Sequence, residues 1–525
     1  MNRQFRKCCL IVLILVLSFP TTVYGMGFSS ESPASYTRLT VIHINDIQGH
    51  FTPSKATWLD TRPAPPVGGM ASFATYLERE RNEAIHQNRK LLVLDAGDWF
   101  TGTPESDLTE GKAMIEALNQ VEIDFTTIGN HEFDVGVPTL IKRVGNLEHP
   151  VLAGNIRHRY DSTPFPGTSD TAIVQKGSVK VGIFGLITDK MDELTTSESV
   201  KGAVFLDHEK RARQLVTSLK NNGAQFIIGL THLGLKSDKK LAREVDGIDL
   251  IVGGHTHTRV EPPKQVNGTV ITQAGDNLTA VGRLDLDLHS ESGRLMRYRG
   301  GLITLYHDRY PPDKDVKQTL QPYVDRVNEK LGDVIGKTTA RIEKSSTKSS
   351  PLGNLITDAM REKSGAQLAF QNPYGIRAEL PKGPIQLRKL YEVLPFGNEL
   401  VKMELTGKQL RKLFEQSASL EKGLLQFSGG TVKMDTSATV GNRVQSIRVQ
   451  NNPLNKDETY TIVTNSFLAG GGDKFTVFKH GANKRTMSGV TIRKALAEWF
   501  RNNSSVEPPV ERRYKVIPSA VNQKQ

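Results

Sequence analysis

The sequence predicts an α/β fold or a four-layer sandwich of sheets and helices, and two observations support this prediction. Short apolar runs alternate with helical patterns from Arg38 to about Ile303. Polar loops rich in Asp, Asn and His directly follow several of these runs. Because ligands of such folds bind at the carboxyl ends of strands, we expect the functional site in these loops.

Seven apolar runs have the length and composition of buried strands. They are Leu39–Ile44, Lys90–Leu94, Phe125–Ile128, Val151–Ala153, Val179–Phe184, Phe226–Leu230 and Leu250–Val252. The intervening segments Gly69–Asn88 and Glu110–Gln120 have the pattern of helices.

The chain has 525 residues, more than one hydrophobic core usually covers, so we expect several domains. We assign residues 37–310 to a first domain. The polar stretch Lys314–Leu331 predicts a linker helix, and residues 335–516 have the apolar segments of a second domain.

The N-terminus has the pattern of a secretory signal peptide over residues 1–25. Basic residues precede the apolar stretch Cys8–Phe19, which is too short to span a bilayer comfortably. We therefore expect export to the periplasm, the medium or the cell wall. No later apolar run approaches ~18 residues, so we expect no transmembrane anchor. Both cysteines lie in this leader, so the mature chain has no thiolate for a metal site.

The formal net charge is +12, but Lys and Arg are scattered among Asp and Glu. Blocks of like charge that mark nucleic-acid-binding tails do not occur in the sequence. We therefore expect no nucleic acid polymer as partner, and the net charge is compatible with a mild attraction for anionic substrates. The sequence leaves the oligomeric state open.

Five strand-end loops carry residues that ligate metals. They are Asn45–Gln48, Asp95–Asp98, Gly129–Asp134, Thr231–His232 and Gly253–His257. A carboxylate buried at a strand end is costly unless it is paired or metal-bound, so Asp98 is predicted to bridge two divalent ions. Such ions activate water and neutralise phosphate oxygens. The ligand types favour Mn, Zn, Mg, Fe or Co.

The remaining ligands divide between the two ions. We expect Asp46 and His257 at the first ion, and Asn130, His232 and His255 at the second.

His131 and Asp134 follow these ligands and have the types of a catalytic pair. An imidazole at this place can hydrogen-bond phosphoryl oxygens or protonate a leaving oxygen. A carboxylate three residues later can hold the imidazole in its working tautomer. A purely structural His131, and Asp134 as a helix N-cap, remain open alternatives.

Together the motifs Asp-x-Gln, Gly-Asp, Gly-Asn-His-Glu-Phe-Asp, Thr-His and Gly-His-Thr-His resemble the calcineurin-like metallophosphoesterases, and among them the exported 5′-nucleotidase family. The resemblance implies a four-layer metallophosphoesterase sandwich, joined by a linker helix to a smaller α/β C-terminal domain. It implies a catalytic dyad of His131 and Asp134, and it adds Gln48 to the metal ligands. Most members have His at the position of Gln48, so we expect a looser first ion, or one that is supplied with the substrate.

The second half contains further segments that resemble this family. They are Gly353–Ala359, Leu394–Asn398 and Asn465–Asp473. The resemblance implies a nucleoside clamp, with Phe467 stacking on the base and Asp473 binding the ribose hydroxyls. Phe427 matches the second stacking aromatic of some members, and Arg377 a substrate-binding arginine. A core position for Phe427 and a surface position for Arg377 remain open.

The resemblance implies an exported dinuclear-metal phosphohydrolase that releases phosphate from nucleotides by attack of a metal-bound hydroxide. The simplest substrates are 5′-nucleoside monophosphates. A 2′,3′-cyclic-nucleotide 2′-phosphodiesterase/3′-nucleotidase and a UDP-sugar hydrolase are alternatives. A non-catalytic extracellular nucleotide-binding or surface-interaction protein is the alternative of another class.

Overall fold

The computed structural model describes residues 36–59, 61 and 63–517. The predicted signal peptide, residues 1–25, lies outside these described residues. Within the described part of the chain, no helix combines the length and the apolar character needed to cross a bilayer.

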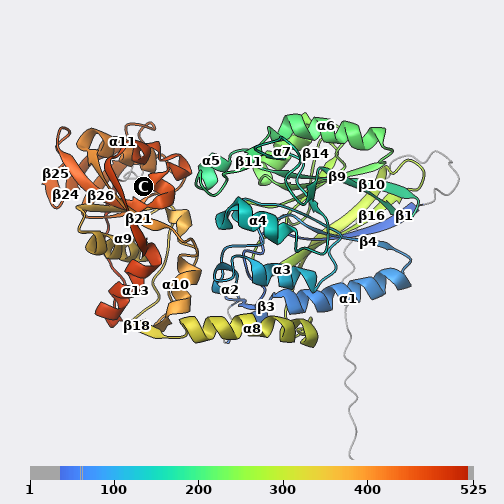
Figure 1. Cartoon of the computed structure of the whole chain (residues 1–525), viewed down its shortest axis with the longest axis horizontal. Helices are drawn as coiled ribbons and strands as arrows, with labels where there is room; N and C mark the ends of the chain where they lie inside the picture. Colours follow the sequence, from blue (N-terminus) through green and yellow to red (C-terminus); the bar gives the residue numbers. More distant parts are fainter. Residues whose placement is uncertain (1–35, 60, 62, 518–525) are drawn as a thin grey trace, which may run out of the picture. The chain divides into compact units, whose positions relative to one another are not determined.

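The first domain contains two large sheets (Figure 1). The seven-stranded sheet has the order β17(Leu295–Thr304), β16(Ala280–His289), β1(Tyr36–Ile44), β4(Lys90–Asp95), β5(Phe125–Thr127), β6(Val151–Leu152), β8(Thr168–Ser169). The six-stranded sheet has the order β14(Lys264–Val266), β15(Thr269–Thr272), β13(Leu250–Gly253), β12(Phe226–His232), β10(Val179–Ile187), β9(Thr171–Lys176). All seven predicted strands are present in these two sheets.

Parallel pairing brings the carboxyl ends of the central strands to one edge of each sheet. In the first sheet β1 pairs in parallel with β4, and β4 with β5. In the second sheet β10 pairs in parallel with β12, and β12 with β13. The loops that follow β1, β4, β5, β12 and β13 therefore start at the carboxyl-end edge of their sheets, as the sequence predicts.

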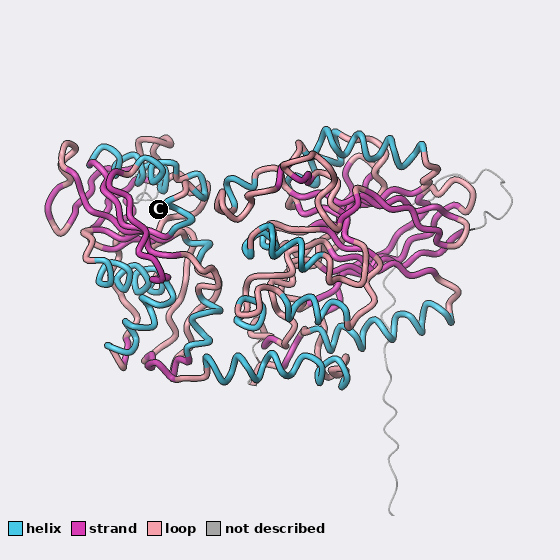
Figure 2. Tube along the Cα trace, in the orientation of Figure 1, coloured by secondary structure: helices cyan, strands magenta, loops and turns pink. Residues whose placement is uncertain are grey.

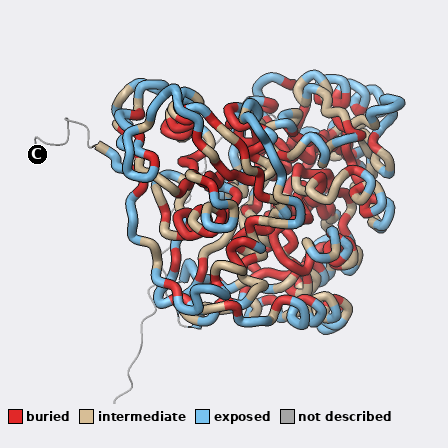
Figure 3. Tube along the Cα trace, turned by 60° about the vertical axis from the view of Figure 1, so that its left-hand side comes forward, coloured by how far each residue is buried: buried red, intermediate tan, exposed pale blue. Residues whose placement is uncertain are grey.

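A hydrophobic core lies between the two sheets. Leu39, Val41 and Leu94 from the first sheet pack in one cluster with Val181 and Leu230 from the second. Branched and aliphatic side chains dominate this cluster, as expected for strands that are buried on both faces. The buried residues, red in Figure 3, gather in the interior of the molecule.

Helices cover the outer face of each sheet (Figure 2). Helices α1 (Met70–His86), α3 (Lys112–Asn119) and α4 (Val137–Val144) pack on the seven-stranded sheet. Helices α6 (His208–Asn221) and α7 (Leu235–Glu244) pack on the six-stranded sheet. The order helix, sheet, sheet, helix makes four layers and confirms the predicted fold class.

Helix α8 (Lys314–Leu331) connects the first domain to the second. Asp313 caps its N-terminus by accepting the N–H groups of Asp315 and Val316. Val316 and Leu320 are buried in the same cluster as the side chains of α1 and α3. The linker helix therefore packs against the first domain along its N-terminal half.

The second domain is built around a five-stranded sheet. Its order is β22(Gln426–Ser428), β19(Leu368–Gln371), β26(Thr459–Asn465), β21(Glu399–Thr406), β27(Ala482–Thr491). Helices α9 (Pro351–Ser364), α11 (Gly407–Ala418) and α13 (Ile492–Asn502) contribute to its two hydrophobic clusters. This domain is mixed α/β, which agrees with the prediction.

Candidate metal centre and substrate cavity

Five of the seven predicted ligands have unusual backbone geometry. Asp46, Gln48, Asp98, His255 and His257 all have φ between 51° and 81°. Residues other than glycine rarely adopt this left-handed region, at a cost of about 1–3 kcal/mol each. Such strain clusters at functional sites, where the surrounding structure enforces a required side-chain direction.

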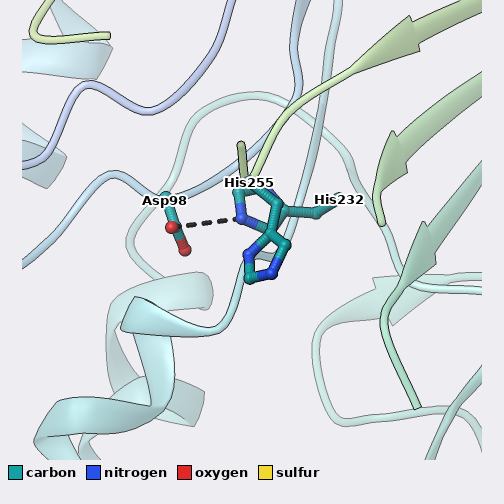
Figure 4. A group of neighbouring side chains, drawn as sticks. All are labelled: Asp98, His232 and His255. Atoms are coloured by element: carbon teal, nitrogen blue, oxygen red, sulfur yellow. Dashed lines mark ion pairs between the residues drawn. The ribbon is translucent and has the colours of Figure 1, made fainter. Parts of the chain in front are cut away.

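Asp98 lies at the centre of the site. Its Oδ2 is 3.1 Å from His232 Nε2, and the two side chains face each other in Figure 4. His232 Nδ1 is 2.7 Å from the carbonyl oxygen of Ala96, which fixes the ring so that Nε2 faces the carboxylate. A side chain at Gly129 would place its Cβ 2.2 Å from Asp98 Oδ1. Glycine is therefore required beside this carboxylate.

Two groups of donor atoms meet at Asp98. Asp98, His232 and His255 form one group, and Asp46, Asp98 and His257 form the other. Within each group the donor atoms lie within 4.8 Å of one another. Carboxylate oxygens and imidazole nitrogens are the donors that Mn, Fe and Zn prefer, so the residues fit divalent metal ions. A carboxylate shared by both groups is the arrangement of a bridging ligand.

Asn130, the remaining residue predicted to bind the second ion, contacts His255. Its Oδ1 is 2.7 Å from His255 Nδ1. The backbone N–H of His255 donates to Asp46 Oδ2 at 3.0 Å, which ties the loop after β13 to the loop after β1.

Asp276 is a site residue that the sequence analysis did not identify. Its Oδ2 is 3.4 Å from His257 Nδ1, while His257 Nε2 is 3.4 Å from Asp46 Oδ1. Burial opposes charge on His257, but the hydrogen bonds to Asp276 and Asp46 outweigh it and raise its pKa to about 9. The signal in the sequence is a lone Asp between Gly275 and Asn277, which carries little information by itself.

Gln48 is buried between the metal-binding groups and the second domain. Its Nε2 donates to Asp98 Oδ2 at 3.1 Å, and its Oε1 accepts from Arg377 Nη2 at 3.1 Å. The structure thus places Gln48 next to Asp98 and also links it to Arg377.

His131 and Asp134 form a close pair beside the metal-binding groups. His131 Nδ1 is 2.7 Å from Asp134 Oδ2, and His131 Nε2 is 4.0 Å from Asp98 Oδ2. Burial opposes charge on His131, but the carboxylates of Asp98 and Asp134 raise its pKa. Phe396 of the second domain stacks on the imidazole, with ring centroids 5.6 Å apart. The geometry is that of an imidazole oriented by a carboxylate.

Glu132 holds the two central loops together. Its carboxylate accepts the backbone N–H groups of Asp98, Trp99, Phe100 and Gly129. The distances run from 2.6 to 3.1 Å. Glu132 is fully buried, and this network fixes the backbone on both sides of Asp98. Glu132 therefore fixes the loops that carry the site, and its carboxylate belongs to neither group of metal-binding atoms.

Asp473 and Phe467 lie together in the second domain. Asn372 Nδ2 donates to Asp473 Oδ2 at 3.0 Å, and burial raises the pKa of Asp473 to about 6. The ring of Phe467 is partly exposed and packs over Gly472, where a Cβ would lie 2.4 Å from it. Their placement is compatible with a nucleoside site.

Phe427 does not lie where a base could reach it, which corrects its assignment as a stacking residue. It is 1% exposed, and its ring packs against Phe370, Phe414 and Tyr514. In β22 it pairs directly opposite Phe370 of β19. Phe427 is a core residue, the alternative that the sequence left open.

A cavity of about 630 Å³ lies next to the metal-binding groups. Gln48 and His257 line it from the first domain, and Lys344, Tyr374 and Arg377 line it from the second. The volume is in the range of small-molecule sites.

The comparisons with known proteins identify the family. A calcineurin-like phosphoesterase model matches residues 39–259, and a 5′-nucleotidase C-terminal domain model matches residues 334–480. The crystal structure of a 5′-nucleotidase precursor from Thermus thermophilus is 32% identical, with a TM-score of 0.83. The match covers 92% of this chain and 100% of that chain. The chain belongs to the 5′-nucleotidase family.

The chain is accordingly a metal-dependent phosphoesterase, and the predicted family, fold class and enzyme class are confirmed. Among curated relatives, the trifunctional nucleotide phosphoesterase protein YfkN of Bacillus subtilis (strain 168) is 29% identical over 96% of this chain. This chain spans only 37% of the length of YfkN. Snake venom 5′-nucleotidase of Crotalus adamanteus is 28% identical, over 90% of this chain and 88% of that protein.

Proposed function

We propose that the protein is an exported phosphohydrolase that releases phosphate from nucleotides, with 5′-nucleoside monophosphates as its main substrates. One observation carries the proposal. The shared carboxylate Asp98 and the His131–Asp134 pair lie in the first domain, and Arg377 of the second domain reaches them through Gln48. Donors for metal ions, an acid–base group and a phosphate-binding cation are thus gathered at one place.

In this proposal the metal centre would hold two divalent ions, with Mn, Zn, Mg, Fe or Co as candidates. Asp46, Gln48, Asp98 and His257 would hold the first, and Asp98, Asn130, His232 and His255 would hold the second. When bound, such ions neutralise phosphoryl oxygens and lower the pKa of the attacking water.

The residues of the first domain have separate tasks in the reaction. His131 is placed to hydrogen-bond the phosphoryl group and to give a proton from Nε2 to the leaving oxygen, because its Nδ1 is engaged by Asp134. Glu132 keeps the Asp98 loop fixed, so that little reorganisation accompanies the reaction.

The second domain recognises the rest of the nucleotide. Arg377 binds a phosphate oxygen, Phe467 stacks on the base, and Asp473 accepts hydrogen bonds from the ribose hydroxyls. In this proposal the first domain comprises residues 37–310, the linker helix Lys314–Leu331, and the substrate-binding domain residues 335–516.

Export is part of the proposal and depends on the signal-peptide pattern of residues 1–25. The name of the Crotalus relative, a venom protein, is in line with export. The name of YfkN describes a protein with three phosphoesterase activities, which favours including cyclic and 3′-nucleotides among the substrates tested.

The test is phosphate release from AMP with Mn²⁺, with and without EDTA. We expect turnover that EDTA abolishes and that Asp98→Ala lowers by ~10³-fold or more. Asp308→Ala, which alters an exposed carboxylate, serves as control. A panel of 3′-AMP, 2′,3′-cyclic AMP and UDP-glucose ranks the substrates. Undiminished activity of Asp98→Ala, or no AMP hydrolysis by metal-loaded protein, would contradict the proposal.

A further inference from the structure

The cavity beside the metal centre has one aromatic wall. Among the described residues that line it, Tyr374 is the one Phe, Tyr or Trp side chain. Tyr374 is 53% exposed, whereas most aromatic side chains of this domain are buried. Large exposed aromatics that line a cavity are candidates for ligand contact, because a ligand that covers the ring removes its apolar surface from water.

The turn that carries Tyr374 is fixed by buried hydrogen bonds. Tyr374 lies in the short helix Pro373–Gly375, directly after Asn372. Asn465 Nδ2 donates to Asn372 Oδ1 at 3.0 Å, and Asn372 Nδ2 donates to Asp473 Oδ2. The same asparagine therefore anchors the Tyr374 turn and the carboxylate assigned to the ribose.

The other end of this turn faces the metal centre. Lys344 Nζ donates to the carbonyl oxygens of Ile376 and Arg377 at 3.2 and 3.0 Å, which fixes the segment after Tyr374. Arg377, three residues after Tyr374, reaches Gln48. One segment thus carries a guanidinium that contacts Gln48 beside the metal-binding groups and a phenol ring that lines the cavity.

A nucleotide has matching chemistry at both ends, since its phosphate is anionic and its base is flat. Phe427 is buried in the core, so it offers no second face for stacking. We propose that Tyr374 is a specificity-determining residue that stacks on the base of the bound nucleotide. This inference depends on the proposed nucleotide substrate.

The test compares a substrate that has a base with one that lacks it. AMP and ribose 5-phosphate share the reacting group and the sugar, and kcat and KM are measured for both with Mn²⁺. Because stacking contributes ~1–3 kcal/mol per base, Tyr374→Ala is expected to raise KM for AMP about tenfold. The rise in KM for ribose 5-phosphate is expected to stay below about threefold, and Tyr374→Phe is expected to restore KM for AMP.

Tyr160→Ala is the matched control, because Tyr160 is 74% exposed and does not line the cavity. Equal KM changes for both substrates in Tyr374→Ala, or an unchanged KM for AMP, would overturn the role of Tyr374. Failure of the proposed function looks different. In that case the metal-loaded wild-type protein would not hydrolyse AMP.

Discussion

Arg377 Nη2 donates a hydrogen bond to Gln48 Oε1, while Gln48 Nε2 donates to Asp98 Oδ2, each at 3.1 Å. A guanidinium has no acceptor, so the contact with Arg377 fixes which end of the amide is oxygen. The NH₂ end then faces Asp98, and an NH₂ group does not ligate a cation. Gln48 must therefore rotate its amide and release Arg377 before it can bind the first ion.

This relationship predicts that Arg377 competes with the first metal ion for Gln48. Arg377→Met is expected to tighten Mn²⁺ binding at this site by on the order of tenfold, since one charge-assisted hydrogen bond no longer opposes it. Gln48→His should also tighten binding, and adding Arg377→Met to it should have no further effect. Calorimetric Mn²⁺ titrations without substrate measure this, with Arg501→Met as a control for an exposed arginine. Equal affinities of Arg377→Met and wild type would contradict the competition.

The His131–Asp134 pair predicts a loss of rate without a loss of metal. His131→Ala is expected to lower kcat for AMP by ~10²–10⁴-fold, the usual contribution of an acid–base group. Its imidazole is outside both donor groups, so Mn²⁺ affinity should change little. Steady-state kinetics and Mn²⁺ titration on the same preparations separate the two effects.

A surface pair of the same spacing provides the control. His158 Nδ1 is 3.0 Å from Asp161 Oδ1, and both side chains are more exposed than the pair at the site. His158→Ala should leave kcat unchanged. A parallel loss of Mn²⁺ binding in His131→Ala would show that His131 maintains the metal site and does not act on the substrate.

Phe427 is expected to contribute to the stability of the fold, and Phe467 to the binding of the nucleotide. Phe427→Ala removes a ring from the centre of a packed cluster and should destabilise the protein by ~3–5 kcal/mol. Phe467→Ala removes a partly exposed ring and should raise KM for AMP about tenfold, with little change in stability. Urea unfolding and AMP kinetics on both variants test this. A larger KM effect for Phe427→Ala, without destabilisation, would restore Phe427 as a substrate residue.

Much of the fold could be predicted because local patterns determine it. Apolar runs such as Phe226–Leu230 are short and continuous, as strands buried between two layers are. The hairpin of β16 and β17 was not among the predicted strands, although residues 283–289 of β16, Arg-Leu-Asp-Leu-Asp-Leu-His, alternate polar and apolar side chains. That alternation is the period of a strand with one exposed face and was sufficient to predict β16.

The site was predictable where the chemistry is carried by strand ends, and less so where it depends on distant partners. Glu132 bonds the backbone of Asp98, more than 30 positions earlier, and a sequence pattern does not reveal such a contact. Phe427 was misassigned because a phenylalanine has the same pattern in a core strand as in a binding pocket. Its burial and its ring contacts with Phe370, Phe414 and Tyr514 separate the two.

Asp473 predicts a pH dependence of nucleoside binding. Burial raises its pKa to about 6, so the side chain is charged above this pH and neutral below it. A carboxylate accepts hydrogen bonds from ribose hydroxyls more strongly than the protonated acid does. Adenosine binding should therefore weaken several-fold as the pH falls from 7 to 5. Adenosine has no phosphate, so the titration of the metal ligands does not obscure the effect.

The raised pKa of Asp473 has the opposite consequence for folding stability, which decreases with pH while nucleoside binding becomes stronger. Between the ordinary pKa of 3.8 and about 6, the folded state retains a proton that the unfolded state has released. The free energy of unfolding therefore falls as the pH rises through this window, and the cost remains above it. Asp473→Asn should flatten both dependences, whereas Asp457→Asn, at an exposed carboxylate, should flatten neither. Calorimetric adenosine titrations and urea unfolding from pH 5 to 8 measure the two effects. If adenosine affinity in Asp473→Asn still fell below pH 6, another group would be responsible and Asp473 would not bind the ribose as an anion.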